Sequence, residues 1–394
     1  MNNSSIDTRL KAFKILFNNE IKLIRIDYLL SDDNTFDNFS DQEIKFIHKI
    51  VYGVIRNKSK LDYYIKQCYD GNFKKLLIKH RMILRIGLFQ LIYMDSIPDY
   101  AAVNTTVDLC KKIDKSRSQL INAVMRALSD YSQINDDASL DIDVKYSHPK
   151  WLVDKWLNQW DEDQVKDLLN WNNTEPRIWF RINSKDNLVG DIYRILDKNS
   201  INFKKNEILD EYFCVSNVQE MLNSKIMKQG MISVQNPANG LVVKLLDPQE
   251  NETIVDGCCA PGGKSTYINE LTKGNIKIHA YDNSSRRLEL MSKALKKNKT
   301  TSIKYHKKDL ISEAIDNYDK GIIDVPCTGT GVISKRVDVK WRRKITDLDE
   351  MNDIQNKILE NVSKYLNKNG VLVYSTCSIE EEENWLIIDK FLNS

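Results

Sequence analysis

Hydrophobic residues in the first third of the chain recur every three or four positions, the spacing of amphipathic helices. Ile6 and Leu10 begin the pattern, and the later stretch "LLIKHRMILRIGLFQLIYM" is apolar on nearly every side, as in a buried central helix. Residues 99–113 and 117–131 continue it as two more predicted helices. Because no alternating strand pattern interrupts them, the sequence predicts an all-α bundle over residues 1–135.

The hydrophobic pattern changes beyond this bundle. Residues 133–143 combine turn-forming and acidic residues with little periodicity, which is typical of a linker. A helical stretch follows in "YSHPKWLVDKWLNQW", and "PRIWFRIN" then alternates like a strand. Residues 188–235 mix short helical and strand-like pieces, so we expect a small α+β subdomain within residues 136–235.

From residue 236 onward, apolar strands and helices alternate regularly. The predicted strands are 253–255, 276–281, 303–305, 321–324 and 371–375, and the predicted helices are 264–272, 285–297 and 346–366. This alternation predicts a parallel sheet with right-handed crossovers, that is, an α/β Rossmann-like domain over residues 236–394. A last helix is expected over residues 380–392.

Composition narrows the class of protein. The chain has 394 residues, 42% of them hydrophobic, which suits two or three domains. Its formal net charge of +3 permits nucleic-acid binding without arguing for it, so any basic surface must be local. The start lacks a signal-peptide pattern and no apolar run reaches the roughly 18 residues of a membrane helix. We therefore expect a cytoplasmic protein with no membrane partner.

A glycine-rich stretch, "VDGCCAPGGKS", follows the first predicted strand of the Rossmann-like domain. Such a turn lets backbone N–H groups approach a nucleotide-like ligand. It lacks the glycine spacing of dinucleotide sites and of phosphate-binding loops, so taken alone it could be an ordinary tight turn. Four aspartates stand at successive strand ends, namely Asp256, Asp282, Asp309 and Asp324. Together they predict a ligand site at the carboxyl edge of the sheet.

Two cysteines follow the last two predicted strands, Cys327 in "DVPCTGTG" and Cys377 in "VYSTCSIEEEEN". If these strands are neighbours, both thiols face one cleft. A lone cysteine is more often a small buried apolar residue, but local N–H dipoles at a strand end favour the thiolate. The seven cysteines are an odd number without a C-x-x-C pair, which favours reduced thiols and no structural metal.

The stretch "SKRVDVKWRRK" follows Cys327 closely and is locally basic. Its charged and aromatic side chains suit phosphate contacts and stacking on bases or riboses. The alternative is a solvated basic loop. The candidate RNA-binding residues are Lys335, Arg336, Lys340, Trp341, Arg342 and Arg343.

Five motifs, in the order "DGCCAPGGKS", "YDNSSRRL", "DVPCTGTGVI", "DVKWRR" and "VYSTCSIEEEEN", resemble those of the RNA cytosine-5 methyltransferases of the RsmB/Sun type. "VYGVIR", "LRIGLFQLIYMDSIP", "AVNTTVDL" and "INAVMRAL" are similar to the NusB-like helical domain at that family's N-terminus, and "SHPKWLVDKW" and "PRIWFRIN" to its connecting segment. The resemblance implies a NusB-like RNA-binding bundle, a small RRM-like α+β subdomain and a methyltransferase domain, with the boundaries given above.

The resemblance also implies S-adenosylmethionine as methyl donor and small-subunit (16S) ribosomal RNA as substrate, with 5-methylcytosine as product. Asp282 would hold the donor's ribose, Asp309 would lie by its adenine, and Asp324 would lie between donor and target base. Cys377 would be the nucleophile, and Cys327 would assist product release. The other residues implied to line the donor pocket are Cys258, Cys259, Ala260, Pro261, Gly262, Gly263 and Lys264.

Three features depart from the family pattern. Asn236 stands where the family usually has Asp, and Cys259 where Ala is common. Relatives also continue through another strand pair, so we expect the fifth strand at or near a sheet edge, with lower stability or edge pairing between molecules. The alternatives are a catalytically inactive RNA-binding protein, a cytosine-5 methyltransferase for another RNA, and a nucleotide-dependent oxidoreductase. The sequence does not fix the oligomeric state, for which a monomer is the expectation.

Overall fold

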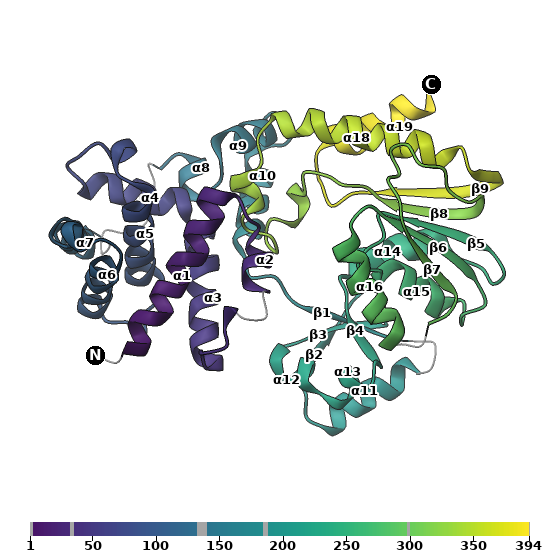
Figure 1. The fold of residues 1–394 in the computed structure, drawn as a ribbon, viewed down its shortest axis with the longest axis horizontal. Helices are drawn as coiled ribbons and strands as arrows, with labels where there is room; N and C mark the ends of the chain where they lie inside the picture. Colours follow the sequence, from purple (N-terminus) through teal and green to yellow (C-terminus); the bar gives the residue numbers. More distant parts are fainter. Residues whose placement is uncertain (1–2, 32–34, 132–139, 184–187, 298–299, 394) are drawn as a thin grey trace. The chain divides into compact units, whose positions relative to one another are not determined.

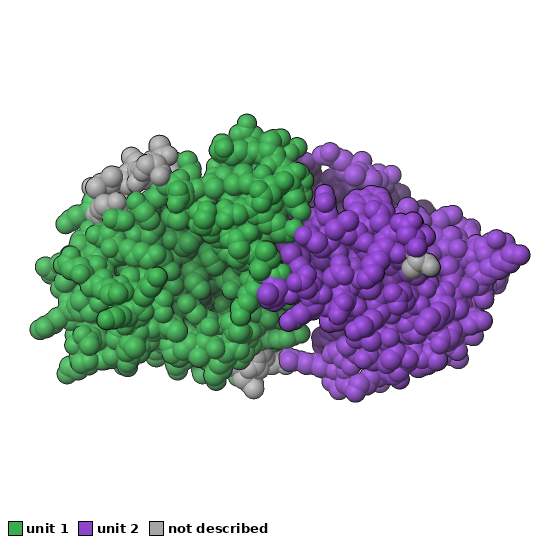
Figure 2. Space-filling model, turned by 90° about the horizontal axis from the view of Figure 1, so that it is seen from above, with its two compact units in different colours: residues 1–175, 332–345 green, residues 176–331, 346–394 purple. Residues whose placement is uncertain are grey.

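The structure, a computed structural model, describes residues 3–31, 35–131, 140–183, 188–297 and 300–393. The chain forms two compact units (Figure 2), one of residues 1–175 and 332–345, the other of residues 176–331 and 346–394. The predicted boundaries at residues 135 and 235 therefore differ from this division. The reason lies in packing: Ser147 bonds to Ser59 of the N-terminal helices (3.0 Å), and Val337 belongs to their hydrophobic core.

The first unit is helical throughout its described residues, as the sequence predicts (Figure 1). Its α-helices are α1 (Asn3–Lys22), α2 (Ile26–Leu30), α3 (Asp41–Arg56), α4 (Lys58–Cys68), α5 (Ile78–Tyr93), α6 (Asp99–Asp114), α7 (Ser118–Tyr131), α8 (Ile142–Lys145), α9 (Lys150–Leu157), α10 (Glu162–Asn173) and α17 (Val339–Arg342), with short 3-10 turns η2 (Phe73–Lys75) and η3 (Lys115–Arg117). Of the predicted linker 133–143, residues 133–139 lie outside the described residues.

Helix α5 is the buried centre of this bundle, as predicted. Arg85 in its middle is 1% exposed, and its guanidinium is paired with Glu20 (2.6 Å) and Asp62 (2.7 Å). A buried guanidinium requires such partners, because an unpaired charge inside a protein is very costly.

The second unit begins with a four-stranded antiparallel sheet of order β2-β3-β1-β4, which confirms the predicted α+β subdomain. Its elements are β1 (Trp179–Ile182), α11 (Val189–Lys198), β2 (Phe203–Lys205), β3 (Tyr212–Val215), α12 (Val218–Asn223), α13 (Lys225–Lys228) and β4 (Ile232–Val234). Phe180 and Phe213 pack on the face covered by these helices, whereas Arg181 and Tyr212 alternate to the opposite face.

The larger sheet has five parallel strands in the order β7-β6-β5-β8-β9, and all five predicted strands are confirmed. The elements are α14 (Pro237–Leu246), β5 (Thr253–Gly257), α15 (Gly263–Leu271), β6 (Lys277–Asp282), α16 (Ser285–Lys297), β7 (Ile303–Lys307), β8 (Tyr318–Asp324), η4 (Thr330–Val332), α18 (Thr346–Ser363), β9 (Leu366–Ser375), η5 (Glu381–Glu383) and α19 (Trp385–Leu392). The strand order reverses between β5 and β8, the place where open α/β sheets bind ligands.

Helices cover both faces of this sheet (Figure 1). α14, α15 and α16 contribute to one hydrophobic cluster and α18 and α19 to another. β9 lies at the sheet edge, as predicted. The helix predicted over residues 380–392 is interrupted, because Asn384 leaves the helical conformation (φ −123°, ψ −96°) and donates to the carbonyls of Ser378 and Glu380.

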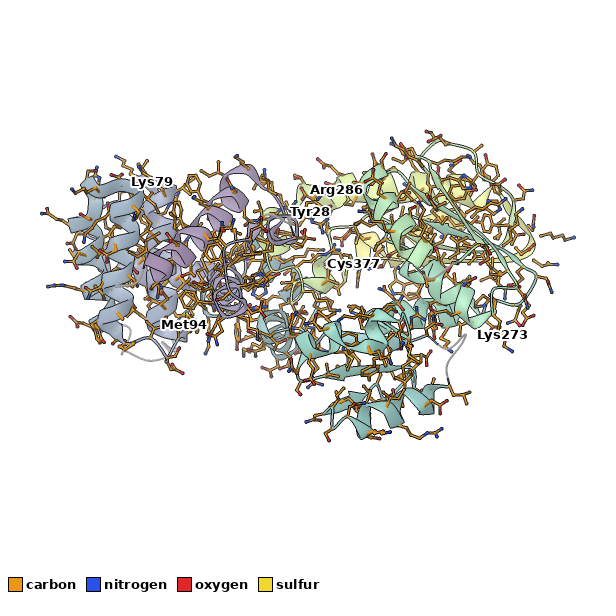
Figure 3. The ribbon with its side chains drawn as sticks, turned by 60° about the horizontal axis from the view of Figure 1, so that its bottom comes forward. Tyr28, Lys79, Met94, Lys273, Arg286 and Cys377 are labelled. Atoms are coloured by element: carbon orange, nitrogen blue, oxygen red, sulfur yellow. The ribbon has the colours of Figure 1, made fainter. Side chains whose placement is uncertain are left out.

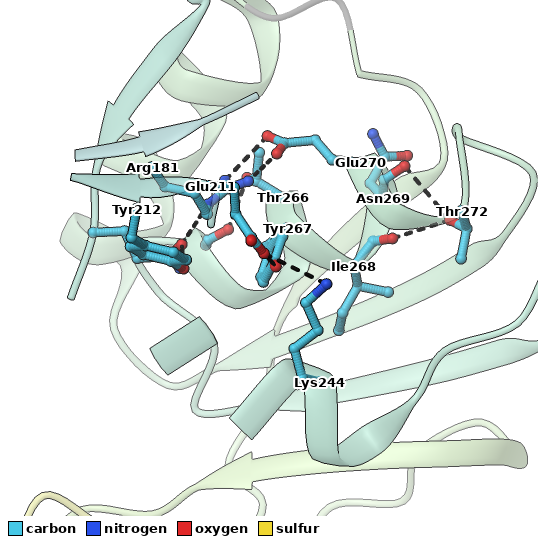
Figure 4. A network of polar contacts seen from close by, with 12 residues as sticks. Arg181, Glu211, Tyr212, Lys244, Thr266, Tyr267, Ile268, Asn269, Glu270 and Thr272 are labelled. Carbon is cyan, nitrogen blue, oxygen red and sulfur yellow. Dashed lines mark hydrogen bonds and ion pairs between the residues drawn. The ribbon is translucent and has the colours of Figure 1, made fainter. Parts of the chain in front are cut away.

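A buried polar network joins the small sheet to α15 (Figure 4). Arg181 of β1 is 1% exposed, donates to Gln235 (2.5 Å) and forms a bidentate ion pair with Glu270 of α15. The Tyr212 hydroxyl also donates to Gln235 (2.8 Å). The orientation of α15 matters because its first turn carries the end of the glycine-rich stretch. None of the described helices is long and apolar enough to span a bilayer.

Candidate active site

The glycine-rich stretch forms the turn between β5 and α15. Cys258 (φ 57°) and Gly262 (φ 93°) both adopt left-handed backbone conformations. A Cβ on Gly262 would lie 2.8 Å from Met291 Cγ, so this position requires glycine. The Cys259 N–H donates to the Tyr281 carbonyl of β6 (3.0 Å), and the Gly262 N–H donates to the Cys259 carbonyl (2.8 Å). Main-chain hydrogen bonds therefore hold the loop in place.

Asp282, the last residue of β6, is buried and bonded to this loop. Its Oδ2 atom accepts from the Ala260 N–H (3.2 Å) and its Oδ1 atom from the Ser284 N–H (2.8 Å). Arg287 lies 2.9 Å from the same Oδ1 atom. Asp309, in contrast, is exposed, two residues beyond the end of β7. Because β6 and β7 are parallel neighbours, both carboxylates stand at the sheet edge that carries the loop.

Asp256 is fully buried beneath the same turn. The Ser265 hydroxyl donates to its Oδ2 atom, and its Oδ1 atom has no hydrogen-bond partner among the described residues. Burial raises the pKa of Asp256 to about 6. The sequence grouped this residue with the other strand-end acids, but the structure places it inside the protein.

Asp324, the last residue of β8, is bound from two sides. Lys264 of α15 places its Nζ atom 2.6 Å from Asp324 Oδ2, and the Ser375 hydroxyl donates to Oδ1 (3.2 Å). Ser375 is the register partner of Asp324 on β9. Lys264, which was predicted with the donor pocket, therefore connects the glycine-rich loop to the two strands that lead to the thiols.

The structure brings the two predicted thiols together. Cys327 follows β8 and Cys377, labelled in Figure 3, follows β9. Their Sγ atoms lie 3.2 Å apart without a disulfide. Both side chains are partly exposed. The neighbouring Cys377 thiol, burial and the charge of Glu383 all raise the pKa of Cys327.

A frame of buried polar side chains holds the two thiol loops. Glu383 accepts from the Thr328 N–H (2.8 Å) and from Gln355 Nε2 of α18 (3.0 Å), and the Thr328 hydroxyl donates to it as well. Gln355 also donates to the Pro326 carbonyl (2.9 Å). The Gly331 N–H donates to the Cys377 carbonyl (3.0 Å). These bonds fix one loop against the other.

This frame is absent from the sequence-based prediction, in which residues 380–383 are a charged helix start. Glu383 is instead 0% exposed. The sequence signal that could have indicated this frame is the density of hydroxyl residues in "CTGT" and "STCS". Two of these residues, Thr330 and Ser378, form a hydrogen bond between their hydroxyl groups (3.1 Å). From the run of four glutamates at 380–383 alone, the sequence does not indicate which of them is buried.

The predicted RNA-binding residues differ in their exposure. Lys335 and Arg336 are exposed, and Arg342 and Arg343 are half-buried, with Arg342 beside Asp338 (3.4 Å). Lys340, however, is 1% exposed and donates to the Arg56 carbonyl (3.1 Å) and to Asn173 Oδ1 (3.0 Å), and the Trp341 indole N–H donates to the Ile55 carbonyl (2.7 Å). Lys340 is thus buried and Trp341 half-buried, and direct RNA contact of the six residues stays a prediction.

Comparison with known families agrees with this architecture. The NusB family model matches residues 6–130, and the ferredoxin-like domain of RsmF/B-like methyltransferases matches residues 148–220. The model of 16S rRNA methyltransferase RsmB/F matches residues 243–394. Fold and site thus define a methyltransferase-type protein with two accessory domains.

Individual relatives give the family. Ribosomal RNA small subunit methyltransferase B of Proteus mirabilis is 31% identical over 367 residues, covering 91% of this chain and 85% of the relative. The probable methyltransferase of the same name from Bacillus subtilis is 29% identical over 368 residues, covering 90% of this chain and 81% of the relative. The chain belongs to the RsmB family of ribosomal RNA small subunit methyltransferases.

Solved structures share the fold. PH0851 superposes with a TM-score of 0.81 at 24% identity, covering 100% of this chain and 90% of that one. A methyltransferase homolog protein from Pyrococcus horikoshii gives a TM-score of 0.59 at 27% identity, covering 66% of this chain and 83% of that one.

Proposed function

We propose that this chain transfers a methyl group from S-adenosylmethionine to carbon 5 of a cytosine in small-subunit ribosomal RNA. The observation that carries the proposal is the 3.2 Å separation of Cys327 and Cys377 at the ends of neighbouring parallel strands, beside Asp324. Family membership supports the methyltransferase class, and the thiol pair supports the cytosine-5 chemistry.

The residues at the sheet edge fit the methyl donor. A helix N-terminus and strand-end carboxylates suit a ligand that combines an amino acid with a nucleoside. Pro261 and Gly263 of the loop are exposed, and a Cβ on Gly263 would meet only Gln235 Nε2 at 3.2 Å. Asp309 offers an exposed carboxylate at the same edge. When bound, S-adenosylmethionine supplies an electrophilic methyl group.

The thiol of Cys377 acts as the nucleophile that activates the cytosine ring. Carbon 5 of cytosine is a poor nucleophile, and addition of a thiolate to carbon 6 makes carbon 5 electron-rich. We assign the attack to Cys377, as the family resemblance implies, with the Cys327 Sγ atom 3.2 Å from it. In this proposal the Asp324 carboxylate accepts from the cytosine amino group and from N3 when N3 becomes protonated as charge builds on the ring. Lys264 and Ser375 bond its two oxygen atoms.

Cys327 then completes the cycle as a base. Once the sulfur of Cys377 is bonded to carbon 6, it carries no charge, which removes one of the causes that raise the pKa of Cys327. Cys327, whose side chain is partly exposed, gives its thiol proton to solvent and, as the thiolate, accepts the proton from carbon 5. The carbon–sulfur bond breaks, the ring double bond re-forms, and Cys377 leaves as a thiolate.

Methyl transfer with labelled donor tests this proposal. We expect label from S-adenosylmethionine in small-subunit ribosomal RNA, no transfer by Cys377→Ala, and a covalent RNA–protein complex that accumulates with Cys327→Ala. Absence of transfer to any RNA by the unmodified chain, with donor still bound, would favour an inactive RNA-binding protein instead. The reverse behaviour of the two variants would exchange the roles of the cysteines.

A further inference from the structure

Two consecutive residues of the second unit, Glu383 and Asn384, lie where the chain leaves η5 and before α19 begins. We call this pair the clamp. Glu383 is 0% exposed and Asn384 is half-buried. Their side chains bond to different loops, that of Glu383 to the loop of Cys327 and that of Asn384 to the loop of Cys377. The clamp is therefore connected to both thiols of the candidate active site.

Asn384 holds the residues on both sides of Cys377. The Thr376 hydroxyl donates to Asn384 Oδ1 (2.8 Å), and Asn384 Nδ2 donates to the Ser378 carbonyl (3.1 Å). The same Nδ2 atom donates to the Glu380 carbonyl (2.8 Å). An asparagine amide has one acceptor oxygen and two N–H donors, so this side chain uses both ends. One amide thus fixes the turn that carries Cys377.

Glu383 holds the residues on both sides of Cys327 in a corresponding way. Its carboxylate accepts from the Thr328 N–H (2.8 Å) and from Gln355 Nε2 (3.0 Å). Gln355 in turn donates to the Pro326 carbonyl (2.9 Å). A carboxylate without exposed surface is costly unless hydrogen bonds compensate it, and Thr328 and Gln355 supply them. The position of Glu383 and that of the Cys327 turn are therefore coupled.

The sheet alone does not place the two thiols. The register of β8 with β9 runs to Asp324 and Ser375 and stops before either thiol. The Gly331 N–H bond to the Cys377 carbonyl joins the two loops to each other. The clamp adds a common support, because the Cα atoms of consecutive residues are about 3.8 Å apart and cannot separate. The two thiol loops are thus bonded to neighbouring points of one segment.

We propose that the clamp residues are positioning residues that act on different steps of the reaction. Asn384 places Cys377 for attack on carbon 6. Glu383 places Cys327 for removal of the proton from carbon 5, on which release of the product depends. This division into steps rests on the proposed function, whereas the placement of the thiols by the clamp does not.

The amount of covalent RNA–protein complex separates the two roles. Displacement of a reacting group by about an ångström costs about a hundredfold in rate, so Asn384→Ala and Glu383→Ala should each lower kcat by roughly tenfold to a hundredfold. The complex should not accumulate in Asn384→Ala, because attack is slowed. It should accumulate in Glu383→Ala, because release is slowed. A general loss of stability would not produce opposite effects at consecutive residues.

Conservative variants and matched controls sharpen this test. Glu383→Gln keeps an oxygen that can accept from the Thr328 N–H and from Gln355, so it should restore most of the kcat that Glu383→Ala loses. Glu381→Ala and Asn393→Ala make the same changes at exposed residues of this segment. Both controls should leave kcat and the amount of complex unchanged.

Disulfide formation in the full-length chain measures the thiol geometry without any RNA. Diamide accepts one hydrogen from each thiol and is reduced to the hydrazine, leaving a Cys327–Cys377 disulfide that lowers the protein mass by two hydrogens. We expect this oxidation to be slower in Asn384→Ala and in Glu383→Ala than in the unmodified chain. Each change releases one thiol loop from the clamp.

Thr328→Val guards against a Glu383→Ala protein that does not fold, because it removes the hydroxyl bond to Glu383 and keeps the N–H bond. We expect slower oxidation and some accumulated complex in this variant too. Unchanged oxidation and kcat in the folded variants would overturn the inference, and equal accumulation of complex in all of them would overturn the division into steps. Slower oxidation in a chain without methyl transfer would uphold the placement of the thiols by the clamp and reject the proposed function.

Discussion

The two sides of the candidate active site are held in different ways. The glycine-rich loop on the donor side is held mainly by the backbone, through left-handed residues and N–H bonds to β6. The thiol side is held by side chains brought from far apart in the sequence, including Glu383 and Gln355. A loop held by its own backbone can therefore be recognised from a short sequence motif, whereas the geometry of the two thiols depends on residues from the whole second unit.

The largest effect is expected on the thiol side, at Glu383. Glu383→Ala leaves the Thr328 N–H and Gln355 Nε2 without their buried acceptor, which should lower the free energy of unfolding by about 3 kcal/mol. Urea unfolding measures this loss. Glu381→Ala, at an exposed neighbour, is the control and should change stability by less than about 0.5 kcal/mol. Equal effects of the two variants would show that the buried frame is not what holds the loops.

The next largest effect concerns pH and the carboxyl beneath the donor loop. Because burial raises the folded-state pKa of Asp256 to about 6, the unfolded chain releases this proton first as the pH rises. As the pH rises from about 4 to about 6, ionisation of Asp256 therefore lowers the free energy of unfolding, by roughly 3 kcal/mol for a shift of two pKa units. Urea unfolding across this range should show a decline that Asp256→Asn reduces. An unchanged profile in the variant would contradict the assignment.

Gly262 tests the backbone character of the donor side. Gly262→Ala places a Cβ 2.8 Å from Met291 Cγ at a φ of 93°, which should cost about 2 kcal/mol of stability and weaken donor binding. The rate at which diamide oxidises Cys327 and Cys377 to a disulfide should stay that of the unmodified chain. Gly190→Ala is the control, since among the described residues beyond its chain neighbours and its own helix backbone no atom lies within 4 Å of the added Cβ. Slower disulfide formation in Gly262→Ala would mean that the glycine-rich loop and the thiol loops are not independent.

The smallest effect on stability is expected at Cys259 of the glycine-rich loop, which we expect to be unreactive, unlike Cys377. Cys259 is buried with a raised pKa and lies 3.7 Å from Met291 Sδ, so it behaves as a packing residue. Cys259→Ala should retain methyl transfer and lose about 1 kcal/mol of stability. Peptide mapping after alkylation should find Cys377 modified and Cys259 protected. Rapid alkylation of Cys259 in the folded chain would contradict this distinction.

Much of this architecture could be predicted from the sequence, because periodicity sets the helices and strands and because parallel strands align their carboxyl ends. That reasoning predicts Asp282, Asp324 and both thiols at the carboxyl ends of the strands of the parallel sheet. It fails where burial depends on a distant partner. The acceptors of Lys340 are the Arg56 carbonyl and Asn173, which no local pattern connects with it. For the same reason the transfer of residues 332–345 to the helical unit could not be predicted.

The most direct test of the central claim is to locate the covalent bond between protein and RNA. The Cys327→Ala chain would be incubated with small-subunit ribosomal RNA and S-adenosylmethionine, digested, and analysed by peptide mass spectrometry. We expect a methylated cytidine attached to the peptide that contains Cys377. Attachment to any other residue, or methyl transfer that persists in Cys377→Ala, would contradict it.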